Sequence, residues 1–302
     1  MTKQASLNGV IAFIIALAVG MPSLKAQELS LSAEDMQYDA NGASITLDGD
    51  ASDWADAEFK SQIPFEKGGE LVLFEEYGGG TWSGPADHSS AVAFAWDASN
   101  LYIGVVVTDD THQNGGSGWN GDSIQMVFAN AAQDTVTHLY NYGLSDGGDV
   151  VIMNEKGPGG SEASITRDED STTTLYEFSF PAASLGLDGY ESGMQIGVGI
   201  CVNDGDTQDG QGGQKGWSGW GPYAAVYGKT ASATGLVNLV GESTSDGPAL
   251  SVVSNGDGTV TMTFEGTLQS APTVNGPWSD VDAASPLTVP ADQAAQFGRA
   301  KN

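Results

Sequence analysis

The sequence predicts an all-β protein, a two-sheet antiparallel β-sandwich of jelly-roll or immunoglobulin-like type, followed by a small C-terminal β unit. Short apolar runs alternate with turn clusters of Gly, Asn, Asp and Ser along the whole chain. Apolar residues recurring at helical spacing are nearly absent. Strands this numerous at this spacing are typical of two packed sheets.

The apolar runs give the predicted elements in order. The turn Asp97-Ala98-Ser99-Asn100 makes residues 91–108 a hairpin, and residues 181–185 form one helical turn. In the C-terminal unit, Asn255-Gly256-Asp257-Gly258 joins two strands. The predicted strands are 44–47, 70–75, 91–96, 101–108, 123–129, 138–142, 150–154, 162–166, 174–180, 195–202, 225–227, 250–254 and 259–264.

The first residues read as a signal peptide. Lys3 precedes the apolar run 10–19, which is too short to span a bilayer, and Ala26 ends a cleavage site. We expect a secreted protein (extracellular, periplasmic or at the cell surface), with no membrane insertion after cleavage; an uncleaved anchor is the alternative. The predicted organisation is 1–26 signal peptide, 27–37 N-terminal lead, 38–240 sandwich, 241–248 linker and 249–302 small β module.

The charge limits the partners. The formal net charge is −29, and loss of Lys3 and Lys25 with the signal peptide makes it −31. Such a chain repels phosphate backbones and acidic lipids, so we expect no nucleic-acid partner. Polyanionic glycans are disfavoured unless calcium bridges them. The single cysteine, Cys201, lies in an apolar run and is expected to be a buried structural thiol without a disulfide.

Tryptophans beside glycine-rich loops are the main functional signal. Trp119 follows Gly115-Gly116-Ser117-Gly118, and Trp217 and Trp220 follow Gly210–Gly216. An indole surrounded by small and polar groups suits a sugar, whose C–H face lies on the ring while its hydroxyls bind the polar groups. The alternative for each tryptophan is packing at the end of the sandwich.

Two acidic stretches could hold structural calcium, which prefers clustered oxygen ligands. The first is the loop Asp204, Asp206 and Asp209, and the second is Asp48, Asp50 and Asp53. Neither has the closing glutamate of the full calcium-loop pattern. Ordinary solvated turns are the alternative.

No catalytic machinery stands out, so we expect no enzyme and no organic cofactor. His88, His112 and His138 are scattered, and no Gly-Xaa-Ser-Xaa-Gly motif occurs. Asp109 and Asp122 flank the Trp119 loop and are the pair to test for glycoside hydrolysis. A haem held by one of the methionines (Met126, Met153, Met194) is disfavoured, because no Cys-Xaa-Xaa-Cys-His motif is present.

Several motifs, in order over about residues 38–240, resemble family 9 carbohydrate-binding modules and the related DOMON-like domains. They are the opening "I-x-x-DG-x-x-x-x-W" at 45–54, "WD-x-x-x-LY" at 96–102, "V-x-D" at 107–109 with "W-x-x-DS" at 119–123, the strand 176–181, and the closing "IG … VND … W … FG" from 196 to 228. The last fifty residues resemble a C-terminal module, "G-x-L-Q-x-A-x-x-V-x-GPW", of secreted proteins from environmental bacteria.

The resemblance implies a non-catalytic module that binds a polysaccharide or oligosaccharide between two aromatic rings, often at the reducing end of a β-glucan or xylan. By position, one ring is Trp119 and the other Trp220, with Trp217 as the alternative. Asn203, Asn120 and Asn141 would contact hydroxyls, and calcium would be structural. The family's sugar-contacting arginine is missing, since 137–142 offers only His138. A structural or adhesive surface protein without a sugar site is the alternative, and the C-terminal unit could bind a surface or enzyme partner.

Overall fold

The computed structural model describes residues 29–115, 119–205, 213–241, 250–264, 266–273, 276–291 and 297–301. The chain divides into two compact units, Met1–Thr244 and Ser245–Asn302. The predicted signal peptide and all but the first residue of the predicted linker lie outside the described residues. Among the described residues, no helix has the length and apolar character needed to cross a membrane.

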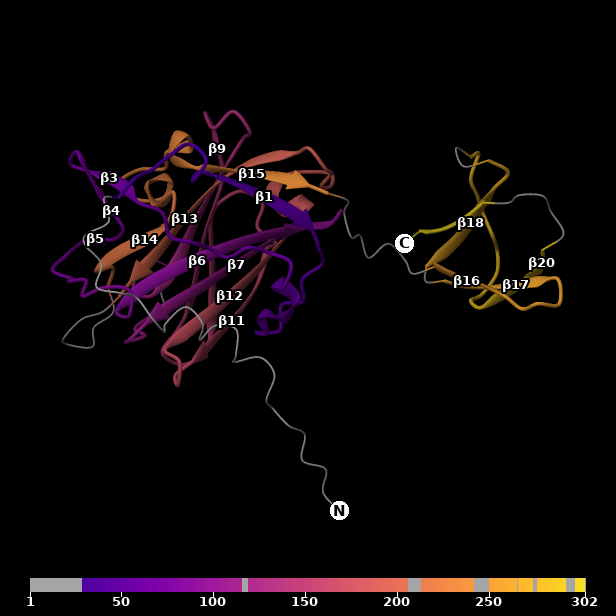
Figure 1. Cartoon of the computed structure of the whole chain (residues 1–302), viewed down its shortest axis with the longest axis horizontal. Helices are drawn as coiled ribbons and strands as arrows, with labels where there is room; N and C mark the ends of the chain where they lie inside the picture. The colour runs from indigo at the N-terminus through magenta and orange to yellow at the C-terminus, as the bar shows by residue number, and fades with distance from the viewer. Residues whose placement is uncertain are drawn as a thin grey trace, which may run out of the picture. The chain divides into compact units, whose positions relative to one another are not determined.

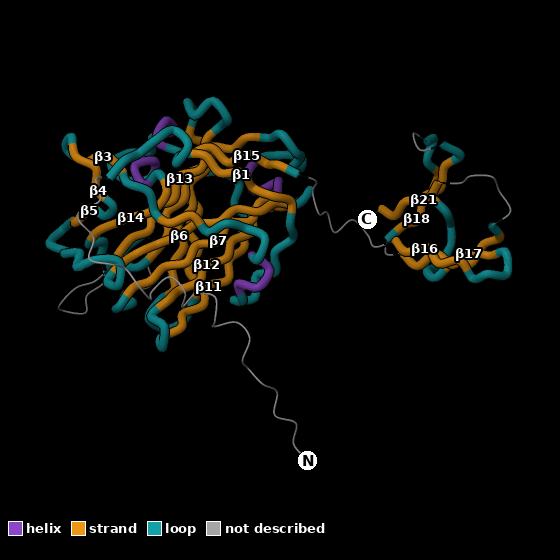
Figure 2. The backbone as a smooth tube through the Cα atoms, in the orientation of Figure 1, coloured by secondary structure: helices purple, strands orange, loops and turns teal. Residues whose placement is uncertain are grey.

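The first unit consists of strands and short 3-10 turns (Figures 1 and 2). Its strands are β1 (Gln37–Gly42), β2 (Lys60–Ser61), β3 (Phe65–Lys67), β4 (Glu70–Val72), β5 (Glu75–Glu76), β6 (His88–Trp96), β7 (Asn100–Asp109), β8 (Ser123–Ala129), β9 (Val136–Leu144), β10 (Val150–Lys156), β11 (Glu162–Asp168), β12 (Thr173–Pro181), β13 (Gln195–Asp204), β14 (Gly216–Trp220) and β15 (Gly235–Val240). The 3-10 turns are η2 (Ala51–Trp54), η3 (Ala182–Leu185), η4 (Pro222–Ala224) and η5 (Ala231–Ala233).

These strands form the predicted sandwich. The order along the hydrogen-bonded path is β10-β9-β8-β13-β15-β1-β6-β7-β12-β11, with β14 beside β13 and β5 beside β14. The two halves of this path face each other, since the ring of Phe180 on β12 lies 4.8 Å from that of Phe128 on β8. The apolar core therefore lies between two layers. The pairing is not wholly antiparallel, because β1 runs parallel to both β15 and β6 where it joins the two layers.

Local sequence explains the central hairpin of β6 and β7. The Asp97 carboxylate accepts hydrogen bonds from the backbone N–H groups of Ser99 and Asn100, both at 2.7 Å, which closes the turn as predicted. From Val92 to Trp96 every side chain is buried, because one face packs in the main core and the other is covered by Trp54 and its neighbours.

Several features of the first unit differ from the sequence expectation. Strands β1, β2, β3 and β15 were not predicted, and the predicted strand 70–75 is divided between β4 and β5. Residues 44–47 are irregular, and residues 225–227 form a turn after η4. Strand β14 was not predicted because Gly216 and Gly219 lower its strand propensity. Gly216 is required by packing, since a Cβ there would stand 2.1 Å from the Phe74 ring.

The second unit contains two small sheets, β16-β17-β20 and β19-β18-β21. Their bounds are β16 (Leu250–Ser254), β17 (Thr259–Phe264), β18 (Thr267–Ala271), β19 (Ser279–Asp280), β20 (Leu287–Pro290) and β21 (Phe297–Lys301). The β16–β17 hairpin was predicted from its turn sequence. Of its described apolar residues, only Phe264, Leu268 and Ala271 are buried, so the unit has a small core.

Candidate functional site

An open pocket of about 370 Å³ lies on the outer side of the sheet that contains β14, β13, β8 and β9. It combines four aromatic rings with amide, carboxylate and ammonium groups. Such a mixture of flat apolar and hydrogen-bonding surface suits a small, polar, ring-shaped ligand. Its aromatic and hydrogen-bonding lining residues are Tyr77, Trp119, Trp217, Tyr227, Gln125, Glu155, Gln214 and Lys229.

Trp119 reaches the pocket from the loop between β7 and β8. Its side chain is 46% exposed, so its ring is available to a ligand. The base of the loop is closed by a bridge between Asn114 and Gly121. Gly121 has a φ of +117°, and a Cβ there would stand 2.4 Å from the Gln113 carbonyl oxygen, so only glycine fits this closure.

Trp217 forms part of the pocket wall from β14. Its partners in the neighbouring strands are Glu75 on β5 and Asn203 on β13. It is only 1% exposed because the rings of Tyr77 and Tyr227 lie against it, with centroids 5.2 and 5.5 Å away. Its indole Nε1 is buried and has no hydrogen-bond partner among the described residues.

Trp220 does not line the pocket, so the prediction that it is the second clamp ring is wrong. It is fully buried in the sandwich core, where its ring packs 5.3 Å from Phe94. Its indole Nε1 donates to the carbonyl oxygen of Asp35 at 2.8 Å. The reason is geometric: residues three apart on a strand point to opposite faces, so when Trp217 faces the pocket Trp220 faces the core.

The predicted asparagines differ in their placement. Asn141 and Asn203 are buried behind the pocket, where each is bonded to a lining residue. The Asn141 amide donates to Glu155, and the Gln214 amide donates to the Asn203 oxygen. They therefore orient the lining side chains and do not themselves line the pocket. Asn120 is exposed and lies outside the lining.

A cation does line the pocket, although from a different segment than expected. Lys229 follows η4, and its ammonium donates to the carbonyl oxygen of Ala225 at 2.7 Å and to Gln125 at 3.5 Å. No carboxylate pairs with it among the described ion pairs. His138 is buried and packs on Phe128 and Tyr140, away from the lining.

A group of buried acidic residues lies at the ends of β7, β8 and β13. Asp109, Asp122 and Asp204 are at most 3% exposed. Burial, together with the charge of Asp204, raises the pKa of Asp109 to about 7. Burial, followed by the charge of Asp109, also raises the pKa of Asp122 well above its usual value. Desolvation lowers the pKa of the adjacent His88 to about 3, so His88 is neutral and offsets none of this charge.

Three of these residues could hold a metal ion. One ligand atom from each of His88, Asp109 and Asp204 lies within 4.8 Å of the others. Carboxylate oxygens are calcium ligands, while an imidazole nitrogen is a ligand of zinc and related ions. The donor set therefore fits a divalent cation, with two oxygen donors for calcium. Asp206 and Asp209 lie outside the described residues, so their part in such a site stays a prediction.

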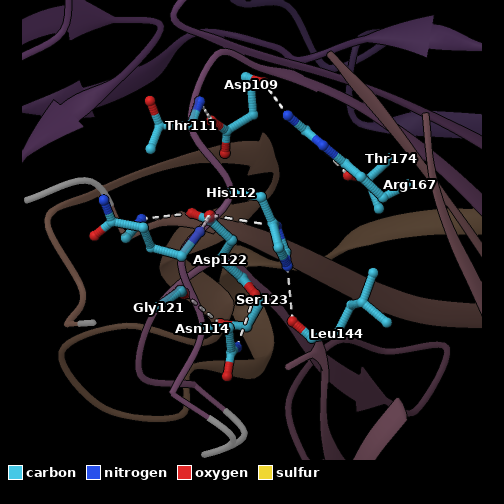
Figure 3. Close-up of polar contacts among 12 residues, drawn as sticks. Asp109, Thr111, His112, Asn114, Gly121, Asp122, Ser123, Leu144, Arg167 and Thr174 are labelled. Carbon is cyan, nitrogen blue, oxygen red and sulfur yellow. Dashed lines mark hydrogen bonds and ion pairs between the residues drawn. The ribbon is translucent and has the colours of Figure 1, made fainter. Parts of the chain in front are cut away.

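Asp122 connects the acidic group to the two loops beside the pocket (Figure 3). Its carboxylate accepts hydrogen bonds from the backbone N–H groups of Gln113 and Gly205. Its other neighbour is His112, whose Nδ1 lies 3.4 Å away. Gly205 approaches so closely that a Cβ there would stand 2.6 Å from the Gln113 carbonyl oxygen. The Trp119 loop and the loop after β13 are thus joined through one carboxylate.

The second predicted calcium cluster forms a set of turns. Asp48 accepts from the N–H of Asp50, Asp50 caps η2 through the N–H of Ser52, and Asp53 accepts from the N–H of Thr46. Among the described residues these three carboxylates do not form a group with metal-ligand spacing. Their hydrogen bonds match the alternative of ordinary acidic turns.

The catalytic possibilities fail on geometry. Asp109 and Asp122 are both buried, at 2% and 3% exposure, whereas a glycosidase needs two carboxyl groups that face each other across an open cleft. Ser218 lies 2.9 Å from His88 Nε2, which resembles a nucleophile and its base. Both side chains are fully buried, so no substrate could reach them.

Six of these lining residues were not predicted from the sequence: Tyr77, Tyr227, Gln125, Glu155, Gln214 and Lys229. One signal could have found Tyr77, because it precedes Gly78-Gly79-Gly80 just as Trp119 follows a glycine-rich loop. Gln125 and Glu155 lie on ordinary strands and carry no such signal. They reach the pocket only through the pairing of β8, β9 and β10.

A β-sandwich with an open, aromatic-lined pocket on one face has the architecture of a ligand-binding module. The model of the family described as "Carbohydrate family 9 binding domain-like" matches residues 65–242, more than half of the chain, and the chain belongs to this family. The family binds carbohydrate and is non-catalytic, which confirms the predicted resemblance and the expectation that the chain is not an enzyme.

Solved structures share the fold. A family 9 carbohydrate-binding module from Caldicellulosiruptor kristjanssonii in complex with cellotriose has a TM-score of 0.52 at 14% identity, covering 69% of this chain and 95% of that chain. The same kind of module from that organism in complex with glucose has a TM-score of 0.51 at 14% identity, covering 69% and 98%. No curated protein matches the chain significantly.

Proposed function

We propose that the chain is an exported, non-catalytic carbohydrate-binding protein that holds a sugar in the Trp119 pocket. The observation that supports this most is the convergence of exposed and half-exposed aromatic rings with four hydrogen-bonding side chains in one open pocket. A sugar ring would lie with its C–H face on Trp119. Trp217 would contribute apolar surface from the pocket wall.

The polar lining would bind the hydroxyl groups. Glu155 accepts, Lys229 donates, and the amides of Gln125 and Gln214 do both. The pocket volume, about 370 Å³, suits one or two sugar units and not a long stretch of polymer. Similar folds bind cellotriose and glucose, so β-linked gluco-oligosaccharides are the first ligands to test.

The test is a retention screen of the purified chain on soluble and insoluble glycans, run with calcium and with chelator. Wild-type retention on one glycan class, lost in Trp119→Ala, is the expected result. If a well-folded wild-type protein binds no glycan, the proposal fails and the structural or adhesive alternative replaces it.

We also infer that a divalent cation, calcium first, binds at Asp109 and Asp204. Buried carboxylates this close are stabilised by a cation, which would supply positive charge where neutral His88 supplies none. Because Asp122 joins this group to both loops, the cation would also order the pocket.

Thermal unfolding tests this inference. After chelation the melting temperature should fall, and calcium should restore it. Restoration by zinc alone would assign the site to a nitrogen-preferring ion through His88. An unchanged melting temperature with all three treatments would overturn the site.

Export is supported by the sequence of residues 1–26 alone. If it occurs, the mature protein begins at Gln27, which N-terminal sequencing of protein recovered outside the cytoplasm would show. An N-terminus that begins at Met1 would contradict it. In this proposal, the second unit would hold the sandwich at a surface or beside an enzyme.

A further inference from the structure

Tyr227 is the most exposed large aromatic ring that lines the pocket. Its side chain is 71% exposed, and its φ of +57° lies in the left-handed region that residues other than glycine rarely adopt. An exposed ring and an uncommon backbone conformation both cost free energy, and such costs cluster at binding sites. Its ring packs against that of Trp217 in a T-shaped arrangement, with the ring centroids 5.5 Å apart and the ring planes at 77°.

A buried carboxylate holds this ring in place. Glu75 on β5 is 3% exposed, and its Oε1 accepts a hydrogen bond from the Tyr227 hydroxyl at 2.9 Å. Its Oε2 accepts from the Tyr223 hydroxyl at 2.6 Å. The Lys67 ammonium lies 3.2 Å from Oε1 and offsets part of the cost of burying the charge.

We propose that Tyr227, fixed by Glu75, is the second ring of the sugar clamp that begins with Trp119. Trp217 then serves mainly as the support on which Tyr227 and Tyr77 rest. The inference rests on the proposed function, because it concerns the same pocket. It assigns Tyr227 as a binding residue and Glu75 as a positioning residue that does not touch the sugar.

The arrangement favours Tyr227 over the other two candidates. Trp217 is only 1% exposed, so little of its face is open to a ligand. Tyr77 is 47% exposed, but within the described part of the chain its hydroxyl has no hydrogen bond that would fix the ring. A ring fixed before binding loses less conformational entropy when the ligand arrives. Glu75 supplies this fixation for Tyr227 alone among the pocket-lining rings.

The test is isothermal titration of the full chain with cellotriose, or with the trisaccharide of whichever polysaccharide retains the wild type. Tyr227→Ala should weaken binding about tenfold or more, and Tyr227→Trp should restore it. Tyr227→Phe and Glu75→Gln should each weaken it about threefold. Their combination should be no worse than Tyr227→Phe alone, because Glu75 acts on the Tyr227 ring through the hydrogen bond that Tyr227→Phe already removes. Phe297→Ala, which removes an exposed ring in the second unit, is the matched control.

The outcomes separate this inference from the proposed function. If the wild type binds and Trp119→Ala abolishes binding, but Tyr227→Ala keeps full affinity, the clamp assignment is overturned and the proposed function stands. Additive losses for Tyr227→Phe and Glu75→Gln would overturn the positioning role of Glu75. A wild type that binds no glycan overturns the proposed function and this inference with it. Melting temperatures of Trp119→Ala and Phe297→Ala should match the wild type, because both rings are exposed.

Discussion

Replacing Trp220 distinguishes a core residue from a binding residue. Trp220→Ala removes a fully buried indole from between the two sheets, together with its hydrogen bond to the Asp35 carbonyl. Deletion of a buried Trp side chain costs about 3–5 kcal/mol, and loss of the hydrogen bond to the half-buried Asp35 adds about 1 kcal/mol. In a domain of this size each kcal/mol lowers the melting temperature by about 2–4 °C. We therefore expect a fall of roughly 8–24 °C.

The assay is thermal unfolding followed by circular dichroism, with Trp119→Ala as the matched variant. Trp119 is 46% exposed, so its removal should change the melting temperature by less than about 2 °C. Trp220→Phe, which keeps an aromatic ring in the core, should lose about half as much stability as Trp220→Ala. A Trp220→Ala protein that melts with the wild type but no longer binds glycan would refute the core placement.

Three further predictions follow from the same geometry. In chelator, the free energy of unfolding should fall as the pH rises from about 4 to about 7, because the folded state holds a proton on Asp109 that the unfolded chain releases at lower pH. Calcium should raise the melting temperature at pH 8 and not at pH 4. A melting temperature that changes with neither pH nor calcium would contradict the buried acidic group. Gly121→Ala should weaken glycan retention, because its Cβ would collide with the Gln113 carbonyl that closes the Trp119 loop; unchanged retention and stability would refute this closure. Cys201 should resist thiol reagents until the protein unfolds, because it is fully buried and burial raises the pKa of its thiol; rapid labelling of the native protein would contradict that placement.

Much of the fold could be predicted from local pattern. The 123–129 strand and the 91–108 hairpin were visible because alternating apolar residues and an Asx turn are encoded within a few positions. Strand β14 was not, since its sequence Gly-Trp-Ser-Gly-Trp becomes a strand only by pairing with β13 and by packing Gly216 against Phe74. The parallel pairing of β1 depends on contacts about 200 residues away in sequence and has no local signal.

Only part of the candidate site could be predicted from the sequence. Trp119 was found because its loop composition is unusual for a packing residue. Composition alone could not decide whether Trp217 or Trp220 lines the pocket, because the answer depends on which face of β14 points away from the core. Tyr227 and Glu75 are 152 positions apart, and only the fold brings the hydroxyl of one to the carboxylate of the other.

The most direct measurement is calorimetric titration of cellotriose into the wild type and into Trp119→Ala, both in calcium and both shown to melt at the same temperature. We expect saturable heat for the wild type and none for Trp119→Ala. Equal affinity in the two proteins would mean that the sugar binds away from this pocket, and would contradict the proposed site.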